Sequence, residues 1–207
     1  MIEKDVDSDL PIYVTNLGKV NIRYRNLTKE GTKRDLIKTL AVPKVEDKQF
    51  AIPLELRDML GGNTGAVYGR VDTEPAVSKY YREHLFFAQV SPYQLQIKAG
   101  HFNTLVWVTD LKTGKQVEGA VVSIYIDAIS KLSSENKILD RGVTDENGTA
   151  VLKGLKDIDP ELDTFNWKCS DDDCKRIFVR VDNKEDMALM PLINRFKLTH
   201  TGFQITQ

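Results

Sequence analysis

The sequence predicts an all-β protein made of two tandem antiparallel β-sandwiches of the immunoglobulin-like type. Many short segments alternate apolar and polar residues with a period of two, and the stretches between them are short and contain Gly, Asn, Asp or Pro. Helical periodicity is scarce. Short strands at nearly regular spacing with turn signals between them are typical of β-sandwiches. The length of 207 residues suits one large domain or two of about 100 residues each.

The first predicted domain covers residues 1–84. Its clearest strand lies within residues 20–25, where Val20, Ile22 and Tyr24 share one face and polar residues share the other. Residues 10–16 and 65–73 are further strand candidates. Residues 32–42 fit either a short helix or a strand, because their apolar residues satisfy both periods.

The second predicted domain covers residues 85–207 and begins with the strand 85–91. Pro92 ends that strand, because proline cannot donate to a ladder and restricts the residue before it. A single helical turn is expected within residues 158–167, opened by Asp159 and Pro160. Further strands are predicted at 95–99, 104–110, 120–127, 149–154, 176–182 and 187–193.

The acidic turn at residues 144–150, with the sequence TDENGTA, is predicted to close a hairpin. A type I turn followed by Gly148 at positive φ would match the twist of the flanking strands. A second turn is expected at Thr113 and Gly114. Binding of Ca²⁺ through Asp145 and Asn147 is the alternative, but Ca²⁺ needs six or more oxygens and the local sequence offers few.

Charge and motif content exclude several functions. Twenty-nine basic and thirty acidic residues leave a net charge of −1, which argues against a nucleic-acid partner. No apolar run is long enough to span a membrane. The three histidines, His84, His101 and His200, belong to different elements, so only a chance approach of the first two would build a site. We therefore expect no enzyme activity, no catalytic residues, no cofactor and no metal site.

The two cysteines, Cys169 and Cys174, are separated by Ser170 and three aspartates. This spacing does not match a zinc or redox motif, and nearby carboxylates should make the thiols poor nucleophiles. A local disulfide is the preferred interpretation, with two free thiols or a catalytic role as alternatives.

The sequence allows more than one structural role for three aromatic residues. Phe165 and Trp167 form either an interdomain contact or a pair that packs on its own sheet. Trp107 is expected in the sandwich core or on a sheet face.

The ordered segments of residues 85–192 resemble the second of two adjacent macroglobulin-like domains in bacterial α-macroglobulins. The resemblance rests on LKTGKQVEGAVVSIY, GVTDENGTAVLKGL and RIFVRVDNKEDMALMPL, in that order. Residues 10–27 and 52–71 look like the opening and the closing hairpin of the preceding domain of that family. The resemblance thus covers most of the chain.

The resemblance implies a structural scaffold segment, from the N-terminal half of a protein that inhibits proteases by trapping them. Neither cysteine stands in the Cys-x-Glu-Gln stretch of the family's thioester, so thioester and bait regions are expected outside this segment. Both ends of the chain are expected to continue into a longer polypeptide. Expected partners are neighbouring macroglobulin domains, target proteases and a peptidoglycan synthase, and the expected location is the periplasm, with a lipid anchor in the inner membrane.

The competing prediction is a tandem immunoglobulin-like adhesin module that binds a host protein or glycan. Adhesin repeats should resemble one another, whereas the TGK and TDENG signature occurs once here.

Overall fold

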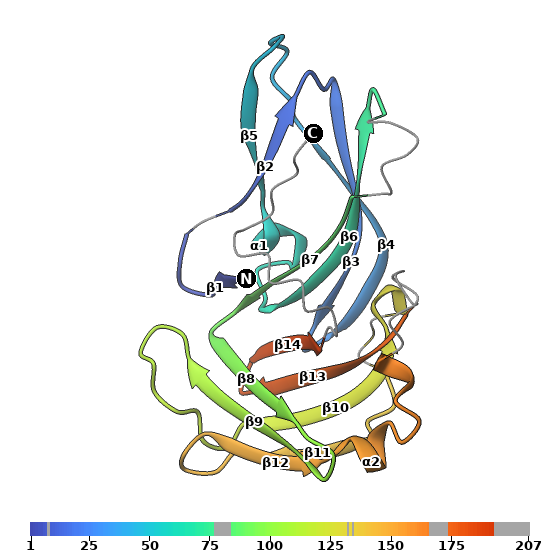
Figure 1. Ribbon diagram of the computed structural model, residues 1–207. Coiled ribbons are helices and arrows are strands. Elements are labelled where there is room, and N and C mark those ends of the chain that lie inside the picture. The colour runs from blue at the N-terminus through green and yellow to red at the C-terminus, as the bar shows by residue number, and fades with distance from the viewer. Residues whose placement is uncertain (8, 77–83, 132, 134, 166–173, 193–207) are drawn as a thin grey trace.

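The computed structural model describes residues 1–7, 9–76, 84–131, 133, 135–165 and 174–192. Over these residues the chain forms two β-sandwiches that pack against each other (Figure 1). The all-β prediction is confirmed, since the helices are single short turns.

The first sandwich combines a five-stranded sheet, in the order β1-β7-β6-β3-β4, with a two-stranded sheet, β2-β5. All neighbours are antiparallel except β1 and β7, which run parallel. Its elements are β1 Ile2–Glu3, β2 Leu10–Thr15, β3 Lys19–Thr28, β4 Gly31–Leu40, β5 Gln49–Leu54, α1 Leu56–Met59, β6 Gly65–Glu74 and β7 His84–Ser91.

The core of the first sandwich follows the period-two pattern of its strands. Val20 and Ile22 on β3 are fully buried and face Ile52 and Leu54 on β5. The segment that fitted either helix or strand is β4, which pairs with β3 along its length, and a bulge interrupts this pairing after Tyr24. The strand alternative was therefore the correct one.

The second sandwich combines a four-stranded sheet, β11-β10-β13-β14, with a three-stranded sheet, β12-β9-β8. Its core holds Val106, Val122 and Val179, all fully buried. Its elements are β8 Tyr93–Ala99, β9 Asn103–Asp110, β10 Val121–Ala128, η1 Ile129–Lys131, β11 Asp140–Val143, β12 Thr149–Lys153, α2 Leu155–Ile158, η2 Asp163–Phe165, β13 Lys175–Asn183 and β14 Asp186–Leu192.

The position of β7 corrects the division expected between residues 84 and 85. β7 pairs with β6 and β1, and its Phe86, Ala88 and Val90 complete the core of the first sandwich. The chain crosses to the second sandwich at Pro92, directly after Ser91. By strand pairing the first sandwich therefore extends to residue 91 and the second begins at β8.

The acidic turn is a corner between sheets rather than a hairpin within one sheet. β11 pairs with β10, whereas β12 pairs with β9 in the opposite sheet. One carboxylate oxygen of Asp145 accepts hydrogen bonds from the N–H groups of Asn147 and Thr149, at 3.0 and 2.8 Å. Gly148 has φ +73°, as the turn requires. These local hydrogen bonds explain the acidic residue without a bound cation.

Thr144 joins this corner to the segment that follows the TGK turn. Its buried hydroxyl donates to the carbonyl of Val117 at 2.6 Å and accepts the N–H of Ala120 at 2.9 Å. The N–H of Thr144 also reaches the carbonyl of Ala120 at 2.9 Å. Two motifs that lie about twenty-five residues apart in the sequence are therefore one structural unit.

The interface between the two sandwiches as the candidate functional site

A separate apolar cluster lies between the sandwiches, and we call it the interface cluster. It is formed where the five-stranded sheet meets β13 and β14 of the second sandwich, in the middle of the molecule (Figure 1). The first sandwich contributes Leu27, Ala66, Tyr68 and the partly buried Phe87, and the second contributes Tyr125, Ile129, Phe178, Met187 and Leu189.

Strands at the interface cluster are apolar on both faces. On β13, Phe178 faces the interface while Ile177 and Val179 face the core of the second sandwich. On β14, Met187 and Leu189 face the interface while Ala188 faces that core. Such double burial is common for central strands, but β14 is an edge strand of its sheet.

The aromatic rings of Tyr125 and Phe178 stack within the interface cluster. Their centroids are 5.3 Å apart and their planes differ by 12°. Phe178 is fully buried and Tyr125 is 3% exposed. Burial raises the pKa of the Tyr125 hydroxyl, and the carboxylates of Asp127 and Asp182 add to the rise against the opposing effect of Arg180. The hydroxyl therefore stays protonated at physiological pH.

Side chains of the first sandwich accept hydrogen bonds from the N–H groups on the free edge of β14. The hydroxyl of Thr64 accepts the N–H of Met187 at 3.0 Å, and the amide oxygen of Gln89 accepts the N–H of Leu189 at 3.0 Å. In an antiparallel pair, alternate residues direct their N–H groups away from the partner strand, so position 191 is next in this series. Pro191 stands there and has no N–H group.

Two ion pairs connect the N-terminal segment of the first sandwich with the second sandwich. The ammonium group of Lys4 lies 2.7 Å from a carboxylate oxygen of Asp186, and that of Lys112 lies 3.2 Å from Asp5. Because these lysines are largely exposed, each pair contributes only about 0–1 kcal/mol. The apolar cluster and the hydrogen bonds to β14 therefore hold the interface.

Tyr93 lies where the chain crosses between the sandwiches. Its hydroxyl donates to the carbonyl of Asn183 at 3.4 Å. Burial is the largest cause that raises the pKa of Tyr93 to about 12, followed by the carboxylates of Asp186 and Asp110.

The three histidines belong to different parts of the chain. His84 begins β7 of the first sandwich, His101 lies in the loop between β8 and β9 of the second, and His200 is outside the described residues. Within the described part of the chain, no three His, Cys, Asp or Glu residues are placed to hold a metal ion. Trp107 lies on the outer face of its sheet and is 38% exposed, so the core alternative was wrong.

The predicted disulfide and the predicted docking pair lie largely outside the described residues. Cys174 is buried next to β13, but Cys169 and Trp167 are not described. The backbone of Phe165 belongs to η2, and its side chain is not described. Both interpretations remain predictions.

The sequence contained a signal for the interface cluster. Residues 187–190 are four consecutive apolar residues, and residues 177–179 are three. Such runs depart from the period-two pattern and indicate strands buried on both faces. Thr64 and Gln89 carry no comparable signal, because their role depends on a strand from the other sandwich.

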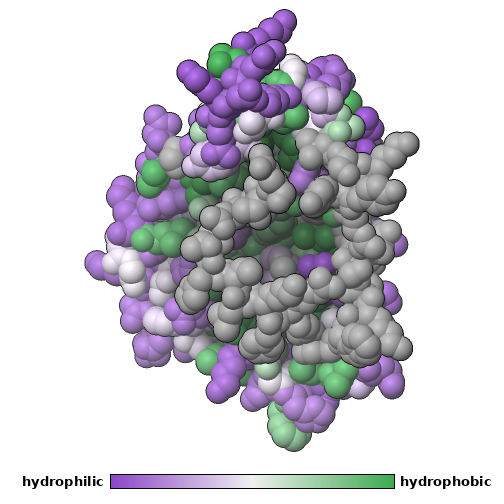
Figure 2. Space-filling view, turned by 45° about the horizontal axis from the view of Figure 1, so that its top comes forward, coloured by the Kyte–Doolittle hydropathy of each residue, from purple (hydrophilic) through white to green (hydrophobic). Residues whose placement is uncertain are grey.

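Two β-sandwiches joined without a linker and packed together through an apolar interface define a tandem immunoglobulin-like module. The surface seen in Figure 2 is largely hydrophilic at its outer rim, with hydrophobic residues toward the middle. No described helix has the length and apolar character needed to cross a membrane.

The fold is similar to that of domains of native α2-macroglobulin from Escherichia coli. A crystal structure spanning its domains NIE-MG1 matches with a TM-score of 0.57 at 11% identity, over 89% of this chain and 88% of that chain. A second structure, spanning MG0-NIE-MG1, matches with a TM-score of 0.58 at 13% identity, over 93% of this chain and 60% of that chain. No protein-family profile matches the sequence. No curated protein matches it either. The expected macroglobulin-like fold is therefore confirmed at the level of structure.

Proposed function

We propose that the chain is a scaffold segment of a bacterial α-macroglobulin that inhibits proteases by trapping them. The observation that carries this proposal is the pairing of a macroglobulin-like fold with a buried interface between its two sandwiches. A trap needs some of its domains to keep fixed angles to one another, and apolar interfaces hold domains in this way where flexible linkers do not. The described residues contribute geometry rather than chemistry to this role, and we propose no enzyme activity for them.

The proposal includes a setting for the parent protein. Neighbouring macroglobulin domains would contact this segment, target proteases would meet the parent protein as a whole, and bait and thioester regions would lie elsewhere in it. The periplasm, a lipid anchor in the inner membrane and association with a peptidoglycan synthase complete the proposal.

A protease protection assay on the full-length gene product tests the trapping role. The full-length protein should block cleavage of a large protein substrate while a small chromogenic peptide is still cleaved, because an enclosed protease excludes only large substrates. The 207-residue segment alone should protect neither substrate.

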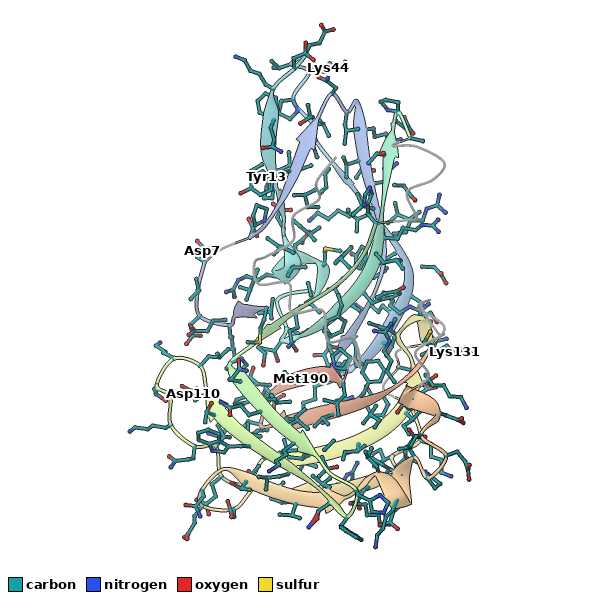
Figure 3. The ribbon with its side chains drawn as sticks, viewed as in Figure 1. Asp7, Tyr13, Lys44, Asp110, Lys131 and Met190 are labelled. Carbon is teal, nitrogen blue, oxygen red and sulfur yellow. The ribbon has the colours of Figure 1, made fainter. Side chains whose placement is uncertain are left out.

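A matched pair of variants links the assay to the interface. Phe178→Ala removes a ring from the interface cluster, whereas Tyr13→Ala changes an exposed residue on β2, away from the second sandwich (Figure 3). The first change should weaken trapping by the full-length protein, and the second should leave it unchanged. The trapping role would be refuted if the protease cleaved both substrates equally well in the presence of the full-length protein. Binding of the protein to host glycans or surface proteins would favour the adhesin alternative.

A further inference from the structure

The outer face of the three-stranded sheet exposes an apolar stripe, which we call the outer stripe. It consists of Leu105 and Trp107 on β9, Val151 on β12, and Phe102 just before β9. These side chains are 41%, 38%, 65% and 69% exposed, respectively. Leu105 and Val151 are direct cross-strand partners, so the stripe is continuous across two strands. Soluble domains seldom leave such a continuous stripe uncovered unless it binds something.

Trp107 is held in place before any partner arrives. Its indole N–H donates to the carbonyl of Asn147 at 3.1 Å, which ties the ring to the corner between β11 and β12. Tryptophan is enriched among the residues that dominate binding energy, and a fixed ring loses little conformational entropy on binding. The outer stripe therefore has a preorganised anchor at one end.

Charge around the outer stripe is polarised. No outward-facing position of β8, β9 or β12 holds an acidic residue, although the chain as a whole carries a net charge of −1. Lys98 and Lys153 flank the stripe on the sheet, and the ammonium group of Lys156 lies 5.1 Å from the centroid of Phe102. All three cations lie toward the Phe102 end, where the carboxylate of Asp140 accepts the N–H of Lys153 at 2.7 Å and offsets one of them, while the acidic turn that contains Asp145 borders the Trp107 end.

The geometry points to the outer stripe as a docking surface for another protein surface with an apolar centre and carboxylates at one end. The carboxylates would meet the lysines near Phe102, and the apolar centre would cover Trp107 and Val151. Complementary charge sets the orientation of such a contact, and the buried aromatic anchor supplies most of its affinity. This surface is distinct from the interface cluster, because the interface cluster lies on the four-stranded sheet of the second sandwich, whereas the outer stripe lies on the outer face of its three-stranded sheet.

Selection of a phage library of random linear peptides on the purified 207-residue chain tests this inference. Enriched peptides should combine aromatic or aliphatic residues with Asp or Glu. Their affinity should fall about tenfold or more on Trp107→Ala and by a similar factor on Val151→Lys. Lys98→Glu with Lys153→Glu should weaken binding and reduce its sensitivity to salt.

Tyr13→Ala serves as the matched control. Tyr13 is an exposed aromatic on β2, at the opposite end of the molecule from β9 (Figure 3). Peptide affinity should be unchanged in this variant, and circular dichroism should show that every variant is folded.

Several results would overturn the inference. These are peptides without acidic residues, peptides that bind Trp107→Ala as well as the parent chain, and an absence of enriched peptides. Self-association of the chain that depends on Trp107 would identify a second copy as the occupant instead. Trp107-dependent binding to anionic lipid vesicles would identify a membrane.

Discussion

Phe178→Ala is the sharpest test of whether the two sandwiches unfold as one unit. Phe178 belongs to β13 of the second sandwich, but its side chain is fully buried in the interface cluster and stacks on Tyr125. Removal of a buried Phe side chain typically costs about 3–5 kcal/mol, of which the ring pair accounts for about 0.5–1.5 kcal/mol. Because both sandwiches contribute to this contact, the loss of stability should extend to the first sandwich as well.

Hydrogen exchange measured by mass spectrometry, together with urea unfolding, can resolve the two sandwiches. In the variant, the amides of residues 66–69 on β6 should lose protection although no covalent change was made in that sandwich. Amides of β10 and β13 should lose protection too. The urea midpoint should fall by an amount that corresponds to about 3–5 kcal/mol.

Val179→Ala is the matched control. Val179 is the next residue on β13, is equally buried, and faces the core of the second sandwich. Its truncation should reduce protection mainly on β10, β13 and β14, with a smaller effect on β6. Unchanged protection of β6 in Phe178→Ala would refute the coupling argued from the interface cluster.

Three further predictions concern a turn, a hydrogen bond and alkaline pH. Gly148→Ala should destabilise the chain by about 1–3 kcal/mol in thermal unfolding, because φ is +73° and a Cβ would lie 2.6 Å from a backbone oxygen of β9. Gly114→Ala, at φ +68° in open space, should cost only about 1 kcal/mol, and equal losses would contradict the argument from the close contact. Gln89→Leu should cost about 1–3 kcal/mol in urea unfolding, because the N–H of Leu189 loses its acceptor at a buried edge; a neutral result would show that this N–H finds another partner. Since the pKa of Tyr93 is raised from 10.0 to about 12 in the folded state, its contribution to stability is complete below pH 10 and is lost as the pH rises toward 12. Tyr93→Phe should therefore flatten the loss of stability between pH 10 and 12, and an unchanged slope would show that Tyr93 is not its source.

The sequence was sufficient to predict most of the strands, because that information is local, although β1 and β5 were not among the predicted strands and β4 was left open between helix and strand. The alternation of Val20 and Ile22 with polar neighbours is enough to assign β3 and its buried face. The positive φ of Gly148 follows from the chemistry of its turn. Sheet membership, in contrast, depends on partners far away in the chain, so the assignment of residues 85–91 to the second domain and of the 144–150 turn to a hairpin were both wrong.

The candidate site was less accessible to sequence analysis, because its parts come from both sandwiches. Consecutive apolar residues such as those on β14 indicate burial on both faces, but they do not identify the second surface. Thr64 and Gln89 are ordinary polar residues until the backbone of β14 lies against them. Trp107 shows the converse problem, since its strand pattern fits a core position and an outer position equally well, and only the pairing of β9 places it outside.

The first sandwich covers the edge of β14, and this contact explains why the two sandwiches should behave as one body. An edge strand with free N–H groups can pair with other chains, and proteins avoid this by covering or interrupting such edges. Here the first sandwich covers the edge through Thr64 and Gln89, and Pro191 has no N–H group to offer at the next position. A hinge motion at Pro92 would have to expose the interface cluster to water and exchange the two hydrogen bonds from β14 for bonds to water, at a net cost of about 0.5–1.5 kcal/mol for each bond. We therefore expect that a parent protein which changes conformation moves this pair as a unit and bends at other joints.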